Sequence, residues 1–177
     1  MNKLLTTILT MTFLTHGLSV WGQKQNVKDN VNDSYSYAKK SNSSADDALT
    51  DIKNAYSESS ISDIQDYAGK GKSNIDDAMT YVKKARNEAG DAESEASNIN
   101  CSVAESNASD AENYFKKAYN EFDDAYSALN NASSEDDKDE LSSYLHKAIS
   151  SINDGMSYLK KAVNSLNDTL SELSNCK

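Results

Sequence analysis

The 177-residue sequence contains no proline, six glycines, two cysteines and one tryptophan. Proline interrupts helix interiors, so its complete absence is typical of a chain that is helical almost throughout. Basic residues are also scarce, with 18 lysines and arginines against 28 aspartates and glutamates, a net charge of −10. Because phosphate binding needs a basic face, this balance excludes nucleic acid as a partner.

The sequence also lacks the usual catalytic and metal-binding motifs. Past residue 22 the only histidine is His146, which its heptad position places on the outer side of its helix. There is no glycine-rich phosphate loop, no zinc-ligand spacing and no Glu-x-x-His pair of the di-iron bundles. Paired acids such as Asp46-Asp47 fall on outermost helix positions, without the glycine pattern of a calcium loop. We therefore expect no catalytic residue, no metal, no cofactor and no enzymatic activity.

The longest apolar stretch lies at the N-terminus and is short. Residues 4–14 are apolar with interspersed threonines, they follow the positive Lys3, and Val20-Trp21-Gly22 resembles a cleavage site. This pattern predicts a secretory signal peptide over residues 1–22, because the stretch is too short and interrupted to span a bilayer. A retained N-terminal anchor is the alternative. We expect a secreted or periplasmic single domain over residues 23–177, with no membrane span after cleavage.

The rest of the sequence is an internal duplication. Residues 24–100 and 101–177 align without a gap and are identical at 28 of 77 positions. An internal repeat defines the unit that folds. The duplication therefore predicts two tandem copies of one helical hairpin.

Apolar and small residues recur at alternating spacings of three and four in four segments. The series run from Val27 to Ala55, Ile61 to Ile99, Ala108 to Ala132 and Leu141 to Cys176. Such spacing keeps one stripe of each helix facing its partners, and disordered segments do not maintain it. With short connections, the pattern predicts an all-α, antiparallel up-down-up-down four-helix bundle resembling a coiled coil. A looser alternative is two hairpins that pair between chains as a dimer.

The predicted helix boundaries rest on two signals. Ser60, Ser102 and Ser134 are each followed three residues later by an acid, which predicts a capped helix start at each serine. The heptad phase slips between Ile99 and Ala104, which predicts a turn between the second and third helices.

The side chains of the buried stripes differ in size between the two repeats. One position of each heptad is nearly always small, and the other is larger in the second repeat, as at Phe115 and Phe122. Small residues bury little area, so we expect the first hairpin to be the less stable half. All ten tyrosines flank the stripes, where their rings can cover a thin alanine core while their hydroxyls reach water.

Cys101 begins the third predicted helix and Cys176 ends the fourth. In an antiparallel hairpin these two ends meet, so the pair can reach the separation that a disulfide needs. An exported protein also folds in an oxidising compartment. We predict a Cys101–Cys176 disulfide, with intermolecular pairing or free thiols as the alternatives.

Every predicted helix carries the pattern Asp-x-x-x-Tyr-x-Lys-Lys. In an up-down bundle the four lysine pairs come to one height, with an acidic belt one heptad away. The alternative is surface charge that supports solubility and helix pairing. The candidate binding girdle consists of Tyr37, Lys39, Lys40, Tyr81, Lys83, Lys84, Tyr114, Lys116, Lys117, Tyr158, Lys160 and Lys161.

Together these patterns predict a non-enzymatic helical bundle that acts as a structural or surface-binding module. The candidate partners are an unknown protein or an anionic glycan surface, and the acidic belt also makes self-association possible. The alternative is a carrier that holds a small apolar ligand between the hairpins, because the core of the first repeat is poorly filled.

Overall fold

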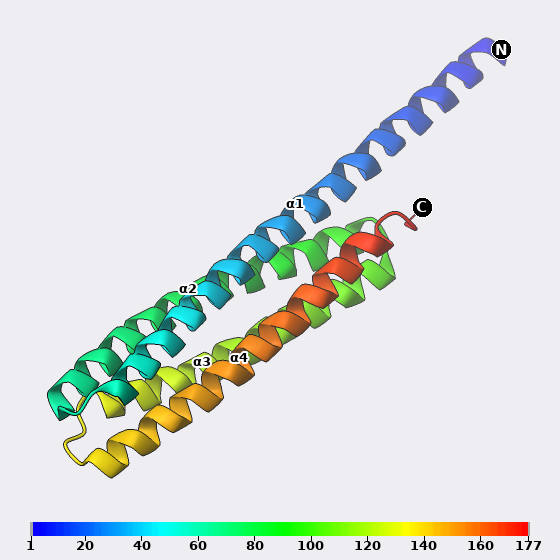
Figure 1. Ribbon diagram of the computed structural model, residues 1–177. Helices are drawn as coiled ribbons and strands as arrows, with labels where there is room; N and C mark the ends of the chain where they lie inside the picture. The colour runs from blue at the N-terminus through cyan, green and yellow to red at the C-terminus, as the bar shows by residue number, and fades with distance from the viewer. Residues whose placement is uncertain (1, 177) are drawn as a thin grey trace.

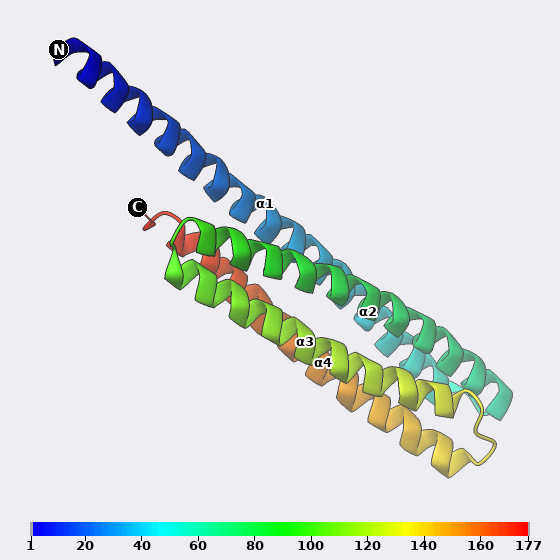
Figure 2. The ribbon, with the colours of Figure 1, turned by 180° about the vertical axis from the view of Figure 1, so that it is seen from behind.

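A computed structural model describes the backbone of residues 2–176 and the side chains of residues 21–176. Four helices make up the described chain, without a strand, and the all-α four-helix prediction is therefore confirmed. They are α1 (Asn2–Ser57), α2 (Ile61–Asn98), α3 (Ser102–Ala132) and α4 (Lys138–Glu172). Successive helices run in opposite directions along one elongated bundle (Figures 1 and 2). Most of the predicted signal peptide falls on residues 1–20, whose side chains lie outside the described part.

The core consists of the predicted heptad stripes. Every residue of the stripe of α1 is buried, including two serines. Ser34 Oγ donates to the carbonyl of Ala85 over 2.7 Å, and Ser41 Oγ donates to the carbonyl of Ala78 over 2.9 Å. A seven-residue step up α1 thus matches a seven-residue step down α2. Both buried hydroxyls are satisfied, and they fix the register of the first hairpin.

The predicted turn lies between α2 and α3, and it is tight. Asn100 has a φ of 54°, in the left-handed region that asparagine tolerates better than most residues. The N–H of Cys101 donates to the carbonyl of Ala96, and the N–H of Asn100 donates to that of Ser97, both over 2.9 Å. This is the Schellman arrangement that ends many helices. It places Cys101 at the start of α3.

The predicted capping residues were mostly wrong. Ser60 does precede α2, but its side chain makes no capping hydrogen bond. The tight turn makes Cys101 the N-cap of α3, so that Ser102 is already helical. The cap of α4 is Asp137, whose carboxylate accepts from two backbone N–H groups of the first turn. Ser134 lies three residues before this cap, and its hydroxyl donates to carbonyls at the end of α3.

The helices do not pack evenly around the bundle. α1 packs along α2, α2 along α3, and α3 along α4, whereas α1 and α4 make far fewer contacts with each other. We call the α2–α3 interface the closed seam and the α1–α4 interface the open seam. Figure 2 shows the closed seam, and Figure 1 shows α1 and α4 on the opposite side.

Candidate functional site

The second hairpin is joined by a disulfide between Cys101 and Cys176, as the sequence predicted. Their Cα atoms lie 5.4 Å apart, which is within the ordinary range for a disulfide. The bond links the start of α3 to the residues that follow α4. The first hairpin has Lys24 and Ile99 at the equivalent positions and therefore has no such link.

The residues of the predicted girdle do not form a continuous ring. On the α1–α2 face, the Nζ atoms of Lys40 and Lys84 each lie between 5.4 and 5.8 Å from the ring centroids of Tyr37 and Tyr81. We call these four residues the first tyrosine–lysine cluster. The separations are within the range in which an ammonium is attracted to an aromatic face.

The duplicated residues form a second tyrosine–lysine cluster on the α3–α4 face. Lys117 Nζ lies 5.3 Å from the Tyr114 centroid and 5.8 Å from that of Tyr158. Lys161 Nζ lies 4.8 Å from the Tyr158 centroid, and the two tyrosine rings stack with centroids 6.5 Å apart. The girdle is thus two equivalent clusters, one on each hairpin.

The other four lysines of the girdle point toward the seams or to solvent. Lys83 Nζ lies 4.8 Å from the ring centroid of Tyr119, across the closed seam. Lys116 is exposed. Lys39 and Lys160 line a groove in the open seam.

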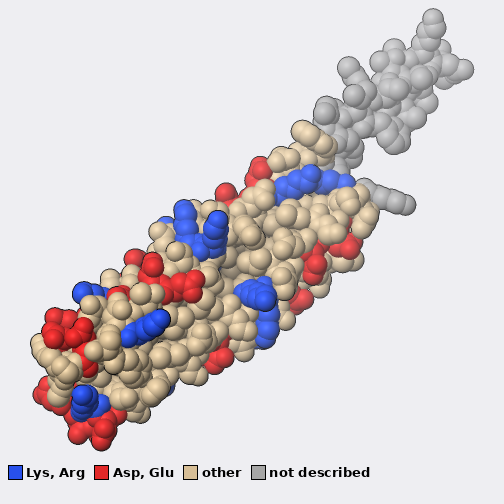
Figure 3. Space-filling model, in the orientation of Figure 1, with Lys and Arg blue, Asp and Glu red and all other residues tan. Residues whose placement is uncertain are grey.

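This groove between α1 and α4 has a volume of about 520 Å³. Figure 3 looks onto this side of the molecule and shows basic side chains on both sides of a largely uncharged strip in mid-bundle. Small-molecule sites in proteins typically have volumes of about 300–1,000 Å³. The lining residues are Tyr35, Ala38, Lys39, Asn42, Asn153, Met156, Ser157, Leu159, Lys160 and Val163.

Two positions of α1 in the open seam have smaller side chains than their equivalents in α3. Ala38 and Asn42 in the groove occupy the repeat positions of Phe115 and Tyr119 in α3. Phe115 is fully buried, and the ring of Tyr119 packs against the core. The second repeat thus fills the closed seam with two aromatic rings, which the first repeat does not supply to the open seam.

The two seams also differ in charge. In the closed seam, Arg86 donates two hydrogen bonds, of 2.9 and 3.0 Å, to Oε1 of Glu112. In the groove, Val163 and Tyr35 stand at the equivalent positions, and an asparagine replaces Asp76. The groove lining therefore contains two lysines and no carboxylate, in a chain with a net charge of −10.

Folding raises the pKa values of two carboxyl groups, those of Glu88 and Glu121. Burial raises the pKa of Glu88, and repulsion from Asp33 and a second aspartate adds to the shift. Burial also raises the pKa of Glu121, to which repulsion from Asp154 contributes. A carboxyl whose pKa is raised by folding binds its proton more tightly in the folded state. Its contribution to stability is therefore present below the unfolded pKa and is lost as the pH rises through the folded value.

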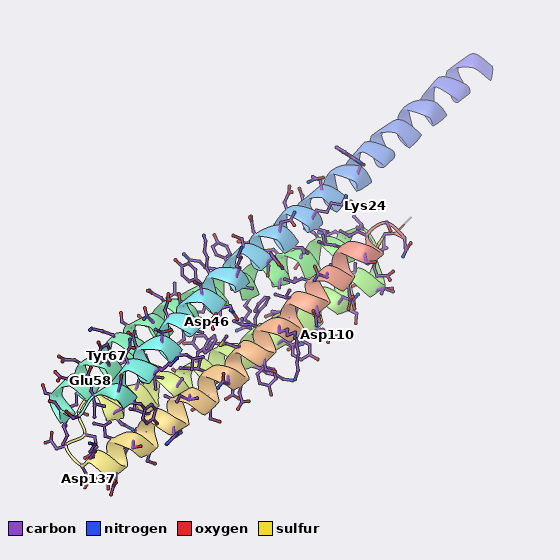
Figure 4. The ribbon with its side chains drawn as sticks, in the orientation of Figure 1. Lys24, Asp46, Glu58, Tyr67, Asp110 and Asp137 are labelled. Atoms are coloured by element: carbon purple, nitrogen blue, oxygen red, sulfur yellow. A yellow bond between two sulfur atoms is a disulfide. The ribbon has the colours of Figure 1, made fainter. Side chains whose placement is uncertain are left out.

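The remaining sequence candidates lie away from the groove. His146 is exposed, and its ring centroid is 5.2 Å from that of Tyr56. Tyr56 also donates from its hydroxyl to the carbonyl of Ser142 over 3.3 Å, at the end of the bundle where Figure 4 labels Asp137. Among residues 21–176, no group of three or more metal-ligating side chains is close enough to hold an ion. In the same part of the chain, no helix is long and apolar enough to cross a bilayer.

No protein-family model matches the chain, and a search of curated proteins found no significant match. The groove and the two tyrosine–lysine clusters are therefore the observations on which a function can rest. Sequence reasoning found the clusters as part of the girdle. It named a carrier with its ligand between the hairpins as the alternative function, but it did not identify the seam or the residues of the groove. The sequence signal for the groove was the replacement of two aromatic residues of the second repeat by Ala38 and Asn42 in the first. This difference in size indicates a groove only when it is known which helices these positions face.

Proposed function

We propose that this protein is an exported, non-enzymatic binding protein that carries a small apolar ligand in the groove between its two hairpins. The single observation behind this proposal is the groove itself, which is apolar at its base and polar at its rim. A concave apolar site with a few polar groups is the usual form of a small-molecule site. The N-terminal sequence pattern and the disulfide support export.

The position of the groove favours entry of a ligand. Two hydrogen bonds join α1 to α4 or to the residues that follow it, and they lie at opposite ends of the bundle. Lys24 Nζ donates to the carbonyl of Cys176, near the C-terminal end of α4, and Tyr56 donates to Ser142 at the other end (Figure 4). Between these contacts α1 and α4 can separate without breaking the packing within either hairpin. The open seam is therefore the interface between neighbouring helices at which entry of a ligand disrupts the fewest helix contacts.

Filling the groove should abolish binding of an apolar probe. The closed seam supplies the design, because Ala38→Phe and Asn42→Tyr introduce the two aromatic residues found at the equivalent positions. We expect the neutral fluorescent probe N-phenyl-1-naphthylamine to bind the native chain and to bind this double variant at least about tenfold more weakly. Fluorescence titration measures both affinities, and circular dichroism verifies the fold.

Two further variants complete the groove experiment. Asn42→Tyr alone changes a partly exposed position, so it tests the site even if the double variant folds poorly. Asn120→Tyr adds the same side chain at an exposed position on α3 and should leave probe binding unchanged. Equal binding by the native chain and both groove variants would reject the groove as the ligand site.

A structural or surface-binding module is the second candidate function, and the duplicated tyrosine–lysine clusters favour it. Two equivalent basic, aromatic sites on separate hairpins would give a long anionic glycan two points of attachment, which increases its apparent affinity. Partners of this kind are proposed from the clusters alone.

The clusters can be tested by their retention on a sulfated glycan column. Replacing the four cluster lysines by glutamine (K40Q, K84Q, K117Q and K161Q) should lower the salt concentration needed for elution, because fewer counterions are displaced. The charge-matched variant K28Q/K53Q/K138Q/K147Q removes four lysines outside the clusters and should elute later than the cluster variant. Identical elution of the two variants would mean that the clusters are ordinary surface charge.

A further inference from the structure

We infer that the ligand of the groove is an amphipathic anion, whose apolar part lies against Ala38, Leu159 and Val163 and whose charged group lies between Lys39 and Lys160. This inference rests on the proposed function and adds a ligand class to it. Its basis is the charge of the groove lining compared with that of the closed seam.

The charge pattern favours an anion over a neutral ligand. Acidic residues outnumber basic ones in the whole chain, and yet the groove is lined by two lysines and no carboxylate. The groove residues Asn153 and Tyr35 correspond, in the other repeat, to the acids Asp76 on α2 and Glu112 on α3. The groove lining therefore retains the lysines that both repeats share. It lacks acids at the two positions where the closed-seam helices carry them, and acids there would repel a negatively charged ligand.

The two lysines of the groove have no carboxylate partner among the described residues, where the one salt bridge joins Arg86 to Glu112. The cluster lysines and Lys83 lie over tyrosine rings, but Lys39 and Lys160 make no such contact. They stand on opposite walls of the groove, one on α1 and one on α4. Two lysines on the two helices that border an apolar groove are charge-assisted donors for a carboxylate or phosphate.

The size of the groove limits the apolar part of the ligand. The lining extends from Tyr35 to Asn42 on α1 and from Asn153 to Val163 on α4. At 1.5 Å per residue these segments are roughly 10 Å and 15 Å long. A volume of about 520 Å³ over this length suits one acyl chain or a compact ring system. A long-chain carboxylate is therefore the simplest ligand that matches both the shape and the charge.

The experiment compares an acid with its neutral ester. The probes are a fluorescent polyene fatty acid and its methyl ester, titrated into the full chain with its disulfide intact. We expect the acid to bind the native chain more tightly than the ester. K39Q/K160Q should weaken binding of the acid about tenfold and change binding of the ester less than about twofold, because only the acid uses the lysines.

The closed seam again provides the matched control. Lys116 and Lys83 are the repeat equivalents of Lys39 and Lys160, so K83Q/K116Q removes the same charge at the same height of the bundle. This control should bind the acid as the native chain does. All four substitutions concern solvent-exposed lysines, and circular dichroism verifies that each variant folds.

The possible outcomes separate this inference from the proposed function. If acid and ester bind equally, or if K39Q/K160Q weakens both alike, the anionic class is wrong and the apolar groove stands. If the control weakens binding of the acid as much as K39Q/K160Q does, the effect is due to net charge and the inference is again wrong. If neither these probes nor the neutral naphthylamine binds, the proposed function is wrong as well.

Discussion

Gly155→Ala is expected to lower the free energy of unfolding by about 1–3 kcal/mol, although alanine is the better helix former. The reason is the ring of Phe122, which packs directly on the glycine from α3. A Cβ atom on Gly155 would lie 2.5 Å from Cε1 and 2.8 Å from Cδ1 of this ring. Phe122 is fully buried, and in a close-packed core its ring cannot move away without displacing its neighbours.

Removing the ring should reverse the sign of this effect. Phe122→Ala alone should destabilise the protein by about 3–5 kcal/mol, because it leaves a cavity in the core. In that background Gly155→Ala should stabilise the protein by up to about 1 kcal/mol, through helix propensity and partial filling of the cavity. The double variant reproduces the first repeat, in which Ala45 and Ala78 occupy the equivalent positions and are both fully buried.

The measurement is a double-mutant cycle by chemical denaturation, and Gly71→Ala is the matched control. A Cβ atom on Gly71 would lie 3.5 Å from its nearest neighbour, the carbonyl oxygen of Ala48, which is an ordinary contact. This substitution should therefore stabilise the protein by about 0.5–1 kcal/mol whether or not Phe122 is present. If Gly155→Ala destabilises both backgrounds equally, contact with Phe122 is not the cause.

The sequence predicted the core well because the core depends on a single periodic property. The spacing of apolar residues determines which face of each helix is buried, and the stripe from Val27 to Ala55 is buried throughout. The disulfide could be predicted for a related reason. Once two helices are antiparallel, the start of one and the end of the other must be close, and Cys101 and Cys176 occupy those ends.

The groove could not be predicted in the same way. The helical period shows which face of each helix is buried, but it does not show which pair of neighbouring helices packs more closely. Poor filling was expected in the core of the first repeat, where α1 carries alanines and serines, and the carrier alternative placed its ligand between the hairpins. Within the first hairpin, however, the helices pack closely, and Ser34 and Ser41 hydrogen-bond to the backbone of α2. The groove lies between α1 and α4, which belong to different hairpins. The small residues of the first repeat allow close packing within its hairpin but leave a groove against the second hairpin.

The structure divides the residues of the predicted girdle between the two clusters, the closed seam and the groove. Neighbouring lysines of a pair point in directions about 100° apart around a helix with 3.6 residues per turn. Lys40 therefore turns toward the tyrosines of its own hairpin, whereas Lys39 turns into the open seam. A level ring of four lysine pairs thus becomes two clusters and a groove lining. The caps were missed because they depend on the residue at which each helix begins: the N-caps of α3 and α4 are Cys101 and Asp137, not Ser102 and Ser134.

The second large effect is expected from the disulfide. C101S/C176S should lower the free energy of unfolding by up to about 4–5 kcal/mol, because the bond closes a loop with a sequence separation of 75 residues. For a chain of this size the midpoint of thermal unfolding should fall by on the order of 10 °C. Reduction of the native protein should reproduce the fall and leave the serine variant unchanged. A native midpoint that does not respond to reductant would contradict the prediction.

The loss of the disulfide should also weaken ligand binding. α4 packs mainly on α3 and only slightly on α1, so the bond between Cys101 and Cys176 is a main restraint on the position of its C-terminal end. α4 also supplies six of the ten residues that line the groove. Once the bond is removed, the end of α4 can move away from α3, and the walls of the groove are held less firmly. The neutral naphthylamine probe should therefore bind C101S/C176S more weakly than the native chain at a temperature where both are folded. Equal affinity would mean that the packing of α4 on α3 is sufficient to hold the groove.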